Sequence, residues 1–403
     1  MLTRRRFLVA LPALAATAHA QKFPFHKKPP PPVPIFVYFG TDTSKGVSKG
    51  IYQSRFNPAT GQLTPPVLAA TTPRPSYLAL APLVRGGRRF LYAVNATNDA
   101  TASVTTFVQD PKTGALQQIG QVPSGGAGPC YVSVDATGKS AYVANYPGGT
   151  LVSYRIEADG TLSQPVDRID FHDAQKFGHR GPNTARQEAP HVHSATISPD
   201  NRFVLACDLG SDDIAVFGID PDTAHLTMGK PYLFQNERPG SGPRHVAFHP
   251  NGRWIYGICE LDSTIDHYLW TTTRSTDTPL GMLVNTNFHI STVAADFPAG
   301  KSTAAEVVVS TDGEFLYASN RGEDTLVVFA IRPKDGNLTF VQRISCGGKT
   351  PRHFVIDATG HFVICGNQDS ANVAVFRRDP ATGKLGGPIQ TVNVDSPMFS
   401  LFA

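Results

Sequence analysis

The chain has 403 residues, of which 41% are hydrophobic and 17% are charged, and this composition excludes a disordered protein. The formal net charge of +4 falls by three, to +1, without the first twenty residues, which gives no reason to expect nucleic acid or a membrane as a partner. No apolar run beyond residue 20 is long enough to cross a bilayer.

The N-terminus has the three parts of an export signal. Residues 3–8 (TRRRFL) form a twin-arginine pattern, residues 9–16 are apolar, and residues 18–20 (AHA) are typical of a cleavage site. We therefore expect residues 1–20 to be a signal peptide, with export to the periplasm or beyond by the twin-arginine route. Residues 21–34 then form a Pro-rich linker.

From residue 35 onward, one pattern recurs at intervals of roughly 45–60 residues. Each copy opens with a short apolar strand, passes a turn, and continues as an aromatic-rich strand that ends in Asn or Asp. A third strand follows, and a fourth comes after a Thr-Gly or Asp-Gly turn. Six copies open at Pro75, Pro129, Pro190, Pro243, Ala305 and Pro351. A repeat of this length with four strands predicts the blades of a β-propeller.

The first copy is incomplete, because residues 35–40 and 50–56 supply only its second and third strands. The missing strand recurs at residues 396–401, where it would complete blade one and remove the open edge of the ring. The sequence thus predicts an all-β fold over 35–403, a seven-bladed β-propeller with four antiparallel strands per blade. A two-domain β-sandwich is the competing fold, and the terminal half-copies argue against it.

Polar side chains recur at two positions of the repeat, the residue after the opening proline and the residue after the middle strand. Because the first two strands of a blade are antiparallel, both positions lie at the same rim. The polar residues at these positions include Ser76, Glu306 and Gln368. Those selected as site residues are Tyr146, His191, Arg244, Glu260, Arg321 and Arg352. Three guanidinium groups around one channel mouth repel each other unless an anion joins them, so we expect a small anionic ligand.

His193 follows His191 by two residues and should face the channel one layer deeper. We interpret the pair as one functional imidazole with a supporting partner, because two ligands on one strand do not complete a zinc site. The five cysteines are widely spaced and lack a CxxC pair, so neither a disulfide scaffold nor a metal site is expected. No cofactor is expected.

Two connections are long. Residues 166–189 are interpreted as an insertion between the last strand of blade three and the first strand of blade four, on the rim of the polar cluster. Its composition fits a lid or wall of a pocket, or a disordered excursion. Residues 271–304 form a second long connection, for which the sequence indicates no role.

Several segments, among them 187–193, 242–245, 260–264, 319–322 and 351–354, resemble those of seven-bladed propeller lactonases. This family includes bacterial 6-phosphogluconolactonase and fungal carboxy-muconate lactonizing enzyme, and the resemblance spans 35–403. It implies an active site that combines one His, two Arg and one Glu. These fall here on His191 (or His193), Arg244, Glu260 and Arg321. The neighbouring substrate-binding residues are then His193, Arg352 and Tyr146.

The resemblance implies hydrolysis of a small anionic sugar lactone by water. Arg244 and Arg321 would bind the anion and stabilise the carbonyl oxyanion, while Glu260 orients or deprotonates the water. Because neighbouring arginines lower the pKa of a carboxyl and weaken it as a base, His191 is the alternative base. No Gly-x-Ser-x-Gly elbow is present, which favours direct attack by water.

Two other functions remain open at this level. A muconate-type cycloisomerase would use the same site, and an exported propeller can also serve as a non-catalytic binding scaffold. Export puts the cytosolic 6-phosphogluconolactone in question as the substrate. The sequence leaves the identity of the lactone and the oligomeric state open.

Overall fold

The computed structural model describes residues 35–82, 87–235, 238–272 and 281–403. The expected signal peptide and linker lie outside the described residues, so the predicted boundaries of these segments stay predictions. Within the described ranges, no helix has the length and apolar character needed to cross a membrane.

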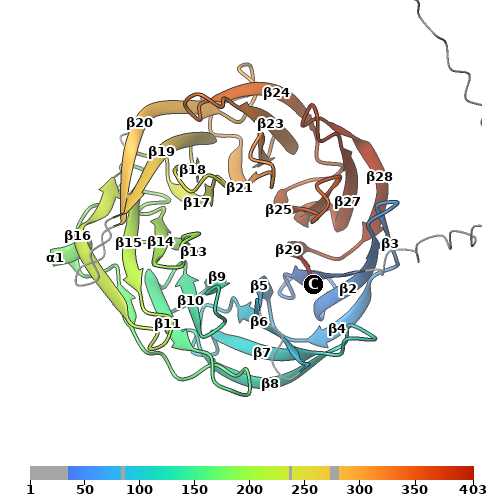
Figure 1. Cartoon of the computed structure of the whole chain (residues 1–403), viewed down its shortest axis with the longest axis horizontal. Helices are drawn as coiled ribbons and strands as arrows, with labels where there is room; N and C mark the ends of the chain where they lie inside the picture. Colours follow the sequence, from blue (N-terminus) through green and yellow to red (C-terminus); the bar gives the residue numbers. More distant parts are fainter. Residues whose placement is uncertain (1–34, 83–86, 236–237, 273–280) are drawn as a thin grey trace, which may run out of the picture. The chain divides into compact units, whose positions relative to one another are not determined.

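The unit Val33–Ala403 is built from seven antiparallel sheets around a central axis, one sheet per blade (Figure 1). The first strand of each blade lies beside the axis and the last lies at the periphery. Blade one comprises β29 (Pro397–Phe402), β1 (Ile35–Thr41), β2 (Gly50–Asn57), β3 (Gln62–Leu63) and β4 (Val67–Thr71). Blade two comprises β5 (Pro75–Leu80), β6 (Arg89–Asn95), β7 (Ser103–Gln109) and β8 (Leu116–Pro123).

Blades three to seven repeat this order. Blade three comprises β9 (Pro129–Val134), β10 (Ser140–Asn145), β11 (Thr150–Arg155) and β12 (Arg168–Asp170). Blade four comprises β13 (Val192–Ile197), β14 (Phe203–Asp208), β15 (Asp213–Ile219) and β16 (Leu226–Gln235). Blade five comprises β17 (Pro243–Phe248), β18 (Trp254–Cys259), β19 (Thr264–Thr272) and β20 (Gly281–Ser291). Blade six comprises β21 (Thr303–Val309), β22 (Phe315–Arg321), β23 (Thr325–Ile331) and β24 (Leu338–Ser345). Blade seven comprises β25 (Pro351–Ile356), β26 (Phe362–Asn367), β27 (Asn372–Arg378) and β28 (Leu385–Asn393).

The ring closes as the sequence predicts. The C-terminal strand β29 pairs with β1 in antiparallel register, with Tyr38 opposite Leu401 and Phe39 opposite Ser400. Blade one therefore takes its innermost strand from the opposite end of the chain. The prediction of seven blades closed by the C-terminal strand is confirmed.

The recurring aromatic and the recurring Gly turn of the sequence pattern meet in space. The Tyr92 hydroxyl in blade two donates a hydrogen bond of 2.9 Å to the Gly160 carbonyl in blade three. Tyr38 and Gly114 repeat this contact between blades one and two at 2.7 Å. Gly160 has φ of +92°, and a Cβ there would lie 2.4 Å from the Phe90 ring. The turn therefore needs glycine both for its backbone conformation and for close packing against the neighbouring blade.

The two long connections differ from the sequence interpretation. The supposed insertion 166–189 includes β12, which is the outer strand of blade three, so the inserted part begins only after Asp170. It carries the short helix α1 (Ala174–Phe177). The connection 271–304 includes β20, the outer strand of blade five, and residues 273–280 lie outside the described part. Both strands were missed because outer strands are half exposed and lack a continuous apolar pattern.

Candidate active site

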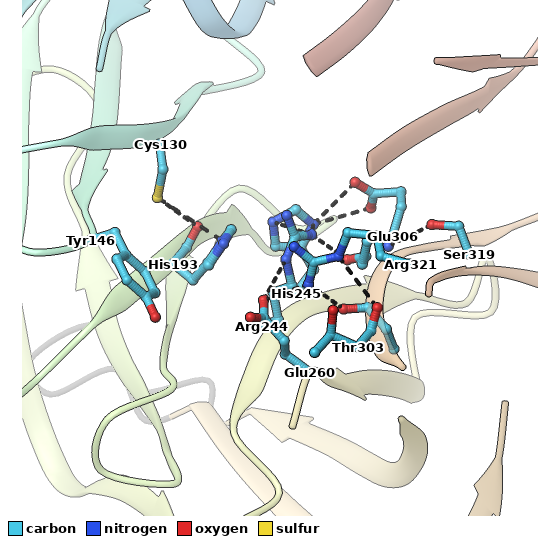
Figure 2. Close-up of polar contacts among 12 residues, drawn as sticks. Cys130, Tyr146, His193, Arg244, His245, Glu260, Thr303, Glu306, Ser319 and Arg321 are labelled. Carbon is cyan, nitrogen blue, oxygen red and sulfur yellow. Dashed lines mark hydrogen bonds and ion pairs between the residues drawn. The ribbon is translucent and has the colours of Figure 1, made fainter. Parts of the chain in front are cut away.

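A pocket of about 410 Å³ lies at the rim where the sequence analysis places the polar cluster. Its polar lining includes Tyr146, Arg186, His193, Glu260, Arg321 and Arg352. These side chains come from blades three to seven and from the inserted segment before β13. Figure 2 shows most of this cluster converging from separate strands. The expected convergence of distant repeats on one pocket is therefore observed.

A β-bulge recurs where the first two strands of a blade pair at this rim. In blade five Pro243 pairs with Cys259 and His245 with Ile258, which leaves Arg244 as the extra residue. A bulge of this kind re-aims one side chain away from the sheet. The extra residues of the other blades, in the same manner, are Met398, Ser76, Cys130, His193, Glu306 with Ala305, and Arg352. The His, Arg and Glu side chains at this position thus belong to blades four to seven.

This register assigns the two histidines differently from the sequence analysis. In blade four Val192 pairs with Asp208 and Ser194 with Cys207, so His193 is the residue equivalent to Arg244. The sequence analysis predicted His191 at this position because it took Pro190 as the first residue of the strand, whereas Pro190 lies two residues before β13. His193 lines the pocket. His191 stacks on Tyr146 with ring centroids 4.5 Å apart.

Both ring nitrogens of His191 already have oxygen partners. Nε2 lies 3.0 Å from Glu188 Oε1, and Nδ1 lies 3.3 Å from the Tyr146 carbonyl. His193 has a different environment, with its Nδ1 4.0 Å from Cys130 Sγ. Burial and the positive charge of Arg244 hold the pKa of His193 well below its usual range, so its imidazole is neutral at neutral pH.

Glu260 immediately follows β18 and is clamped by three arginines. Its carboxylate lies 2.6 Å from Arg186, 2.9 Å from Arg321 and 3.2 Å from Arg244, and the residue is only 4% exposed. Burial opposes its ionisation, but the charges of Arg321, Arg244 and Arg186 outweigh burial and hold the pKa of Glu260 far below its usual range. Glu260 is a permanent anion and a poor proton acceptor.

Arg244 lies beneath the pocket surface. It is 2% exposed, and its guanidinium bridges Glu260 to the Ala305 carbonyl and to the His245 ring. Arg321 is also anchored to the backbone, since it donates to the Ala304 carbonyl at 2.9 Å. Arg244 and Arg321 thus both hold Glu260 while they are anchored to the backbone of β21.

Arg352 is the exception among the pocket arginines. Within the described ranges, its guanidinium makes no hydrogen bond or ion pair, although it lines the pocket. Burial and the charges of Arg244 and Arg321 lower the pKa of Arg352 to about 9, which still leaves it positive at neutral pH. The pocket therefore carries a positive charge that no protein group compensates.

A layer of rings from the first strands lies next to the pocket. Tyr77 lies between Phe399 and Tyr131, with ring centroids at 3.9 and 4.2 Å, and Tyr131 contacts His245 at 5.3 Å. His353 packs against Phe399 at 3.9 Å. We call this ring layer the floor.

A second buried carboxylate, Glu306, lies in the floor. Its oxygens lie 3.1 Å from His245 Nδ1 and 3.6 Å from His353 Nε2 (Figure 2). Burial raises its pKa, but the contact with His245 and His353 outweighs this and brings the pKa of Glu306 to about 2. The pocket and its floor thus each hold one ionised glutamate.

Sequence reasoning missed Arg186 as a site residue, because the inserted segment has no repeat position. It also missed Arg74, which lines the pocket and lies 3.3 Å from Asp42. The five cysteines are free thiols. In the part of the chain that the structure describes, no group of three or more His, Cys, Asp or Glu side chains could hold a metal ion.

Comparison with known proteins agrees with this architecture. The family model described as "Lactonase, 7-bladed beta-propeller" matches residues 36–402. The 6-phosphogluconolactonase of Bacillus subtilis is 32% identical over 280 residues, which cover 70% of this chain and 73% of the relative. A structure of the Pseudomonas aeruginosa periplasmic gluconolactonase is 33% identical, with a TM-score of 0.79, and the match covers 91% of this chain and 98% of that one.

A 6-phosphogluconolactonase of Formosa agariphila is also 32% identical, over 288 residues that cover 70% of this chain and 74% of the relative. The predicted enzyme class is confirmed, and the non-catalytic scaffold is set aside. With its seven closed blades and a family match over nearly all described residues, the chain belongs to the seven-bladed β-propeller lactonases, enzymes that hydrolyse lactones.

Proposed function

We propose that this pocket hydrolyses a small anionic sugar lactone by direct attack of water. The observation that carries the proposal is the uncompensated guanidinium of Arg352 in a pocket whose one carboxylate, Glu260, is already held by three arginines. Arg352 is half-buried, and a cation withdrawn in part from water without a partner is costly unless a ligand supplies the counter-charge. An anionic substituent of the lactone would supply it.

The reaction would proceed through a tetrahedral oxyanion. The oxygen of water attacks the lactone carbonyl carbon while a base takes one proton from the water. Arg321 and Tyr146 both line the pocket, and we assign to them the donation of hydrogen bonds to the resulting oxyanion. The bond between the carbonyl carbon and the ring oxygen then breaks, the ring oxygen takes the proton, and an open-chain hydroxy acid leaves as its anion.

We assign the base to His193, with His191 as the supporting imidazole behind Tyr146. Glu260 is too strongly ionised to accept a proton, and neither nitrogen of His191 is free of an oxygen partner. The neutral imidazole of His193 lines the pocket, and burial disfavours its protonated form. The imidazolium would therefore readily return the proton to the leaving ring oxygen. Glu260 would then orient the water, and Arg244 would hold Glu260.

We further propose that the enzyme acts outside the cytoplasm. The twin-arginine pattern of residues 1–20 supports export, and so does the 33% identity to a periplasmic gluconolactonase. This location favours sugar lactones formed outside the cell or in the periplasm over a phosphorylated cytosolic intermediate.

The test is hydrolysis of glucono-δ-lactone, D-glucaro-1,4-lactone, 6-phosphoglucono-δ-lactone and an uncharged γ-lactone, followed by acid release at constant pH. We expect anionic lactones to have the highest kcat/KM. His193→Ala should lower kcat by about 100-fold or more, whereas His191→Ala should change it less. Activity on none of the four lactones would refute the proposed function, and an unchanged kcat in His193→Ala would refute the assigned base.

A further inference from the structure

The inserted segment before β13 is fixed at its base and open at its tip. The Gln187 amide donates to the Leu209 carbonyl at 2.9 Å, and the backbone N–H of Gly181 donates to the Gly210 carbonyl at 3.0 Å. These contacts attach the segment to the end of blade four. Between them, the turn at 183–186 is exposed or half-buried, and its last residue, Arg186, reaches into the pocket.

Arg186 holds Glu260 in a different way from the other two arginines. Its guanidinium lies 2.6 Å from Glu260 Oε1, whereas Arg244 and Arg321 both contact Oε2. The same guanidinium nitrogen donates to the Tyr146 hydroxyl at 3.1 Å. Arg186 is therefore the arginine that contacts Oε1 of Glu260, and it also donates to the Tyr146 hydroxyl oxygen.

Exposure separates Arg186 further from the other two. Its side chain is 39% exposed, against 3% for Arg244 and 14% for Arg321. Arg244 and Arg321 each bond to backbone carbonyls of blade six, so neither can leave Glu260 without disturbing a blade. A rotation of the Arg186 side chain would disturb no strand pairing, because this residue lies outside the sheets.

We propose that binding of the substrate moves the Arg186 side chain from Glu260 to the substrate. An anionic ligand exchanges with Glu260 for the Arg186 guanidinium, which frees Oε1 to accept a hydrogen bond from the attacking water and frees the Tyr146 hydroxyl oxygen to accept a hydrogen bond from the ligand. This inference rests on the proposed function, since it assigns ligand contact and water placement in the same pocket.

The exchange is favourable because each partner keeps its charge pairing. Glu260 stays ionised between Arg244 and Arg321, and Arg186 trades one oxyanion for another. A neutral lactone offers no group that competes with a carboxylate for a guanidinium, so Arg186 stays paired with Glu260 when it binds. Arg186 would therefore couple recognition of a charged substrate to the positioning of water.

The test compares Arg186→Gln and Arg186→Lys with the matched control Arg168→Gln. Arg168 opens β12 in blade three, is about half exposed, and pairs with Asp170 at 3.0 Å, outside the pocket. For D-glucaro-1,4-lactone and 6-phosphoglucono-δ-lactone, which both carry a free anionic group, Arg186→Gln should raise KM by about 10- to 100-fold, the range for loss of one charged hydrogen bond. For the uncharged γ-lactone, its KM should change by less than about threefold.

A pH profile supplies a readout that a merely structural role would not move. Removal of the Arg186 charge raises the pKa of Glu260 in the free enzyme, so the acidic limb of kcat/KM should move toward neutral pH in Arg186→Gln. Arg186→Lys keeps the charge and should keep the acidic limb in place. It should restore KM only in part, because an ammonium group lacks the planar fork that contacts Glu260 and Tyr146 together.

Three outcomes would refute this role of Arg186. In the first, Arg186→Gln matches Arg168→Gln in KM and in the acidic limb of the pH profile. In the second, Arg186→Gln raises KM equally for charged and uncharged lactones, and in the third, Arg186→Lys restores KM fully. Calorimetric titration with D-gluconate separates this proposal from the proposed function. If the wild type hydrolyses no lactone but binds D-gluconate about tenfold or more tightly than Arg186→Gln, the reaction is wrong and ligand contact by Arg186 stands. Equal D-gluconate affinity would refute that contact.

Discussion

Glu260 and Glu306 are both almost fully buried beside the central channel, at 4% and 6% exposure, but they are held by different partners. Glu260 is held by three guanidinium groups, which stay charged at any ordinary pH. Glu306 is held by the imidazoles of His245 and His353, whose charge varies with pH. The pocket thus has a fixed charge pattern suited to holding an anion, whereas the floor next to it can respond to acid.

The largest expected effect comes from removing the charge of Glu260. Glu260→Gln leaves Arg244, Arg321 and Arg186 around one site without their anion, and we expect a loss of about 3–5 kcal/mol in the free energy of unfolding. Urea denaturation at pH 7 measures it. The exposed pair partner Glu157 provides the control, since Glu157→Gln should change stability by less than about 0.5 kcal/mol. Phosphate should stabilise Glu260→Gln more than the wild type, and absence of this difference would contradict the assignment.

A third buried carboxylate, Asp213, sharpens the comparison because no cation holds it in an ion pair within the described residues. Burial and repulsion from Asp208 and Asp212 raise its pKa to about 7. The folded chain therefore binds this proton more tightly than the unfolded chain, and the stability that the proton confers is lost as pH rises from about 4 through 7. In the other blades the residue opening the third strand is mostly Ser, Thr or Asn, such as Thr150.

We expect Asp213→Asn to be more stable than the wild type by roughly 2–4 kcal/mol at pH 8, with the difference shrinking toward pH 4. Thermal or urea unfolding across this range measures the difference. Asp222, which is 72% exposed, supplies the matched control, because Asp222→Asn should show no such trend. A constant difference between pH 4 and pH 8 would show that Asp213 is already ionised in the folded protein.

The smallest expected effect concerns the floor. Glu306→Gln keeps an acceptor for His245 and His353 but removes the charge, so we expect a loss of about 1–3 kcal/mol at pH 7. Because the pKa of Glu306 is lowered to about 2, its contribution is full above about pH 4.5 and fades as the pH falls toward 2. Unfolding measured from pH 7 down to pH 3 should show the two proteins converging. Rescue of this variant by phosphate would contradict the contrast with Glu260.

Much of this protein could be predicted from the sequence. The closure of blade one by residues 396–401 follows from two half-copies of one repeat, and the convergence of Glu260, Arg321 and Arg352 follows from equal positions in different copies. Such inferences succeed because strand pairing is periodic, so that equal sequence positions occupy equal places in every blade. The outer strands β12 and β20 escaped notice because their half-exposed residues carry little of that period.

The sequence by itself determined the blades, their closure and the rim on which the charged residues meet, because each of these depends on a regular repeat. Only the tertiary structure decided that His193 and not His191 occupies the bulge, that Arg186 joins the site, and that Arg352 has no partner in the described protein. These features depend on a local shift of register and on contacts between segments far apart in the chain. Neither a local register shift nor a contact between distant segments produces a repeating pattern in the sequence.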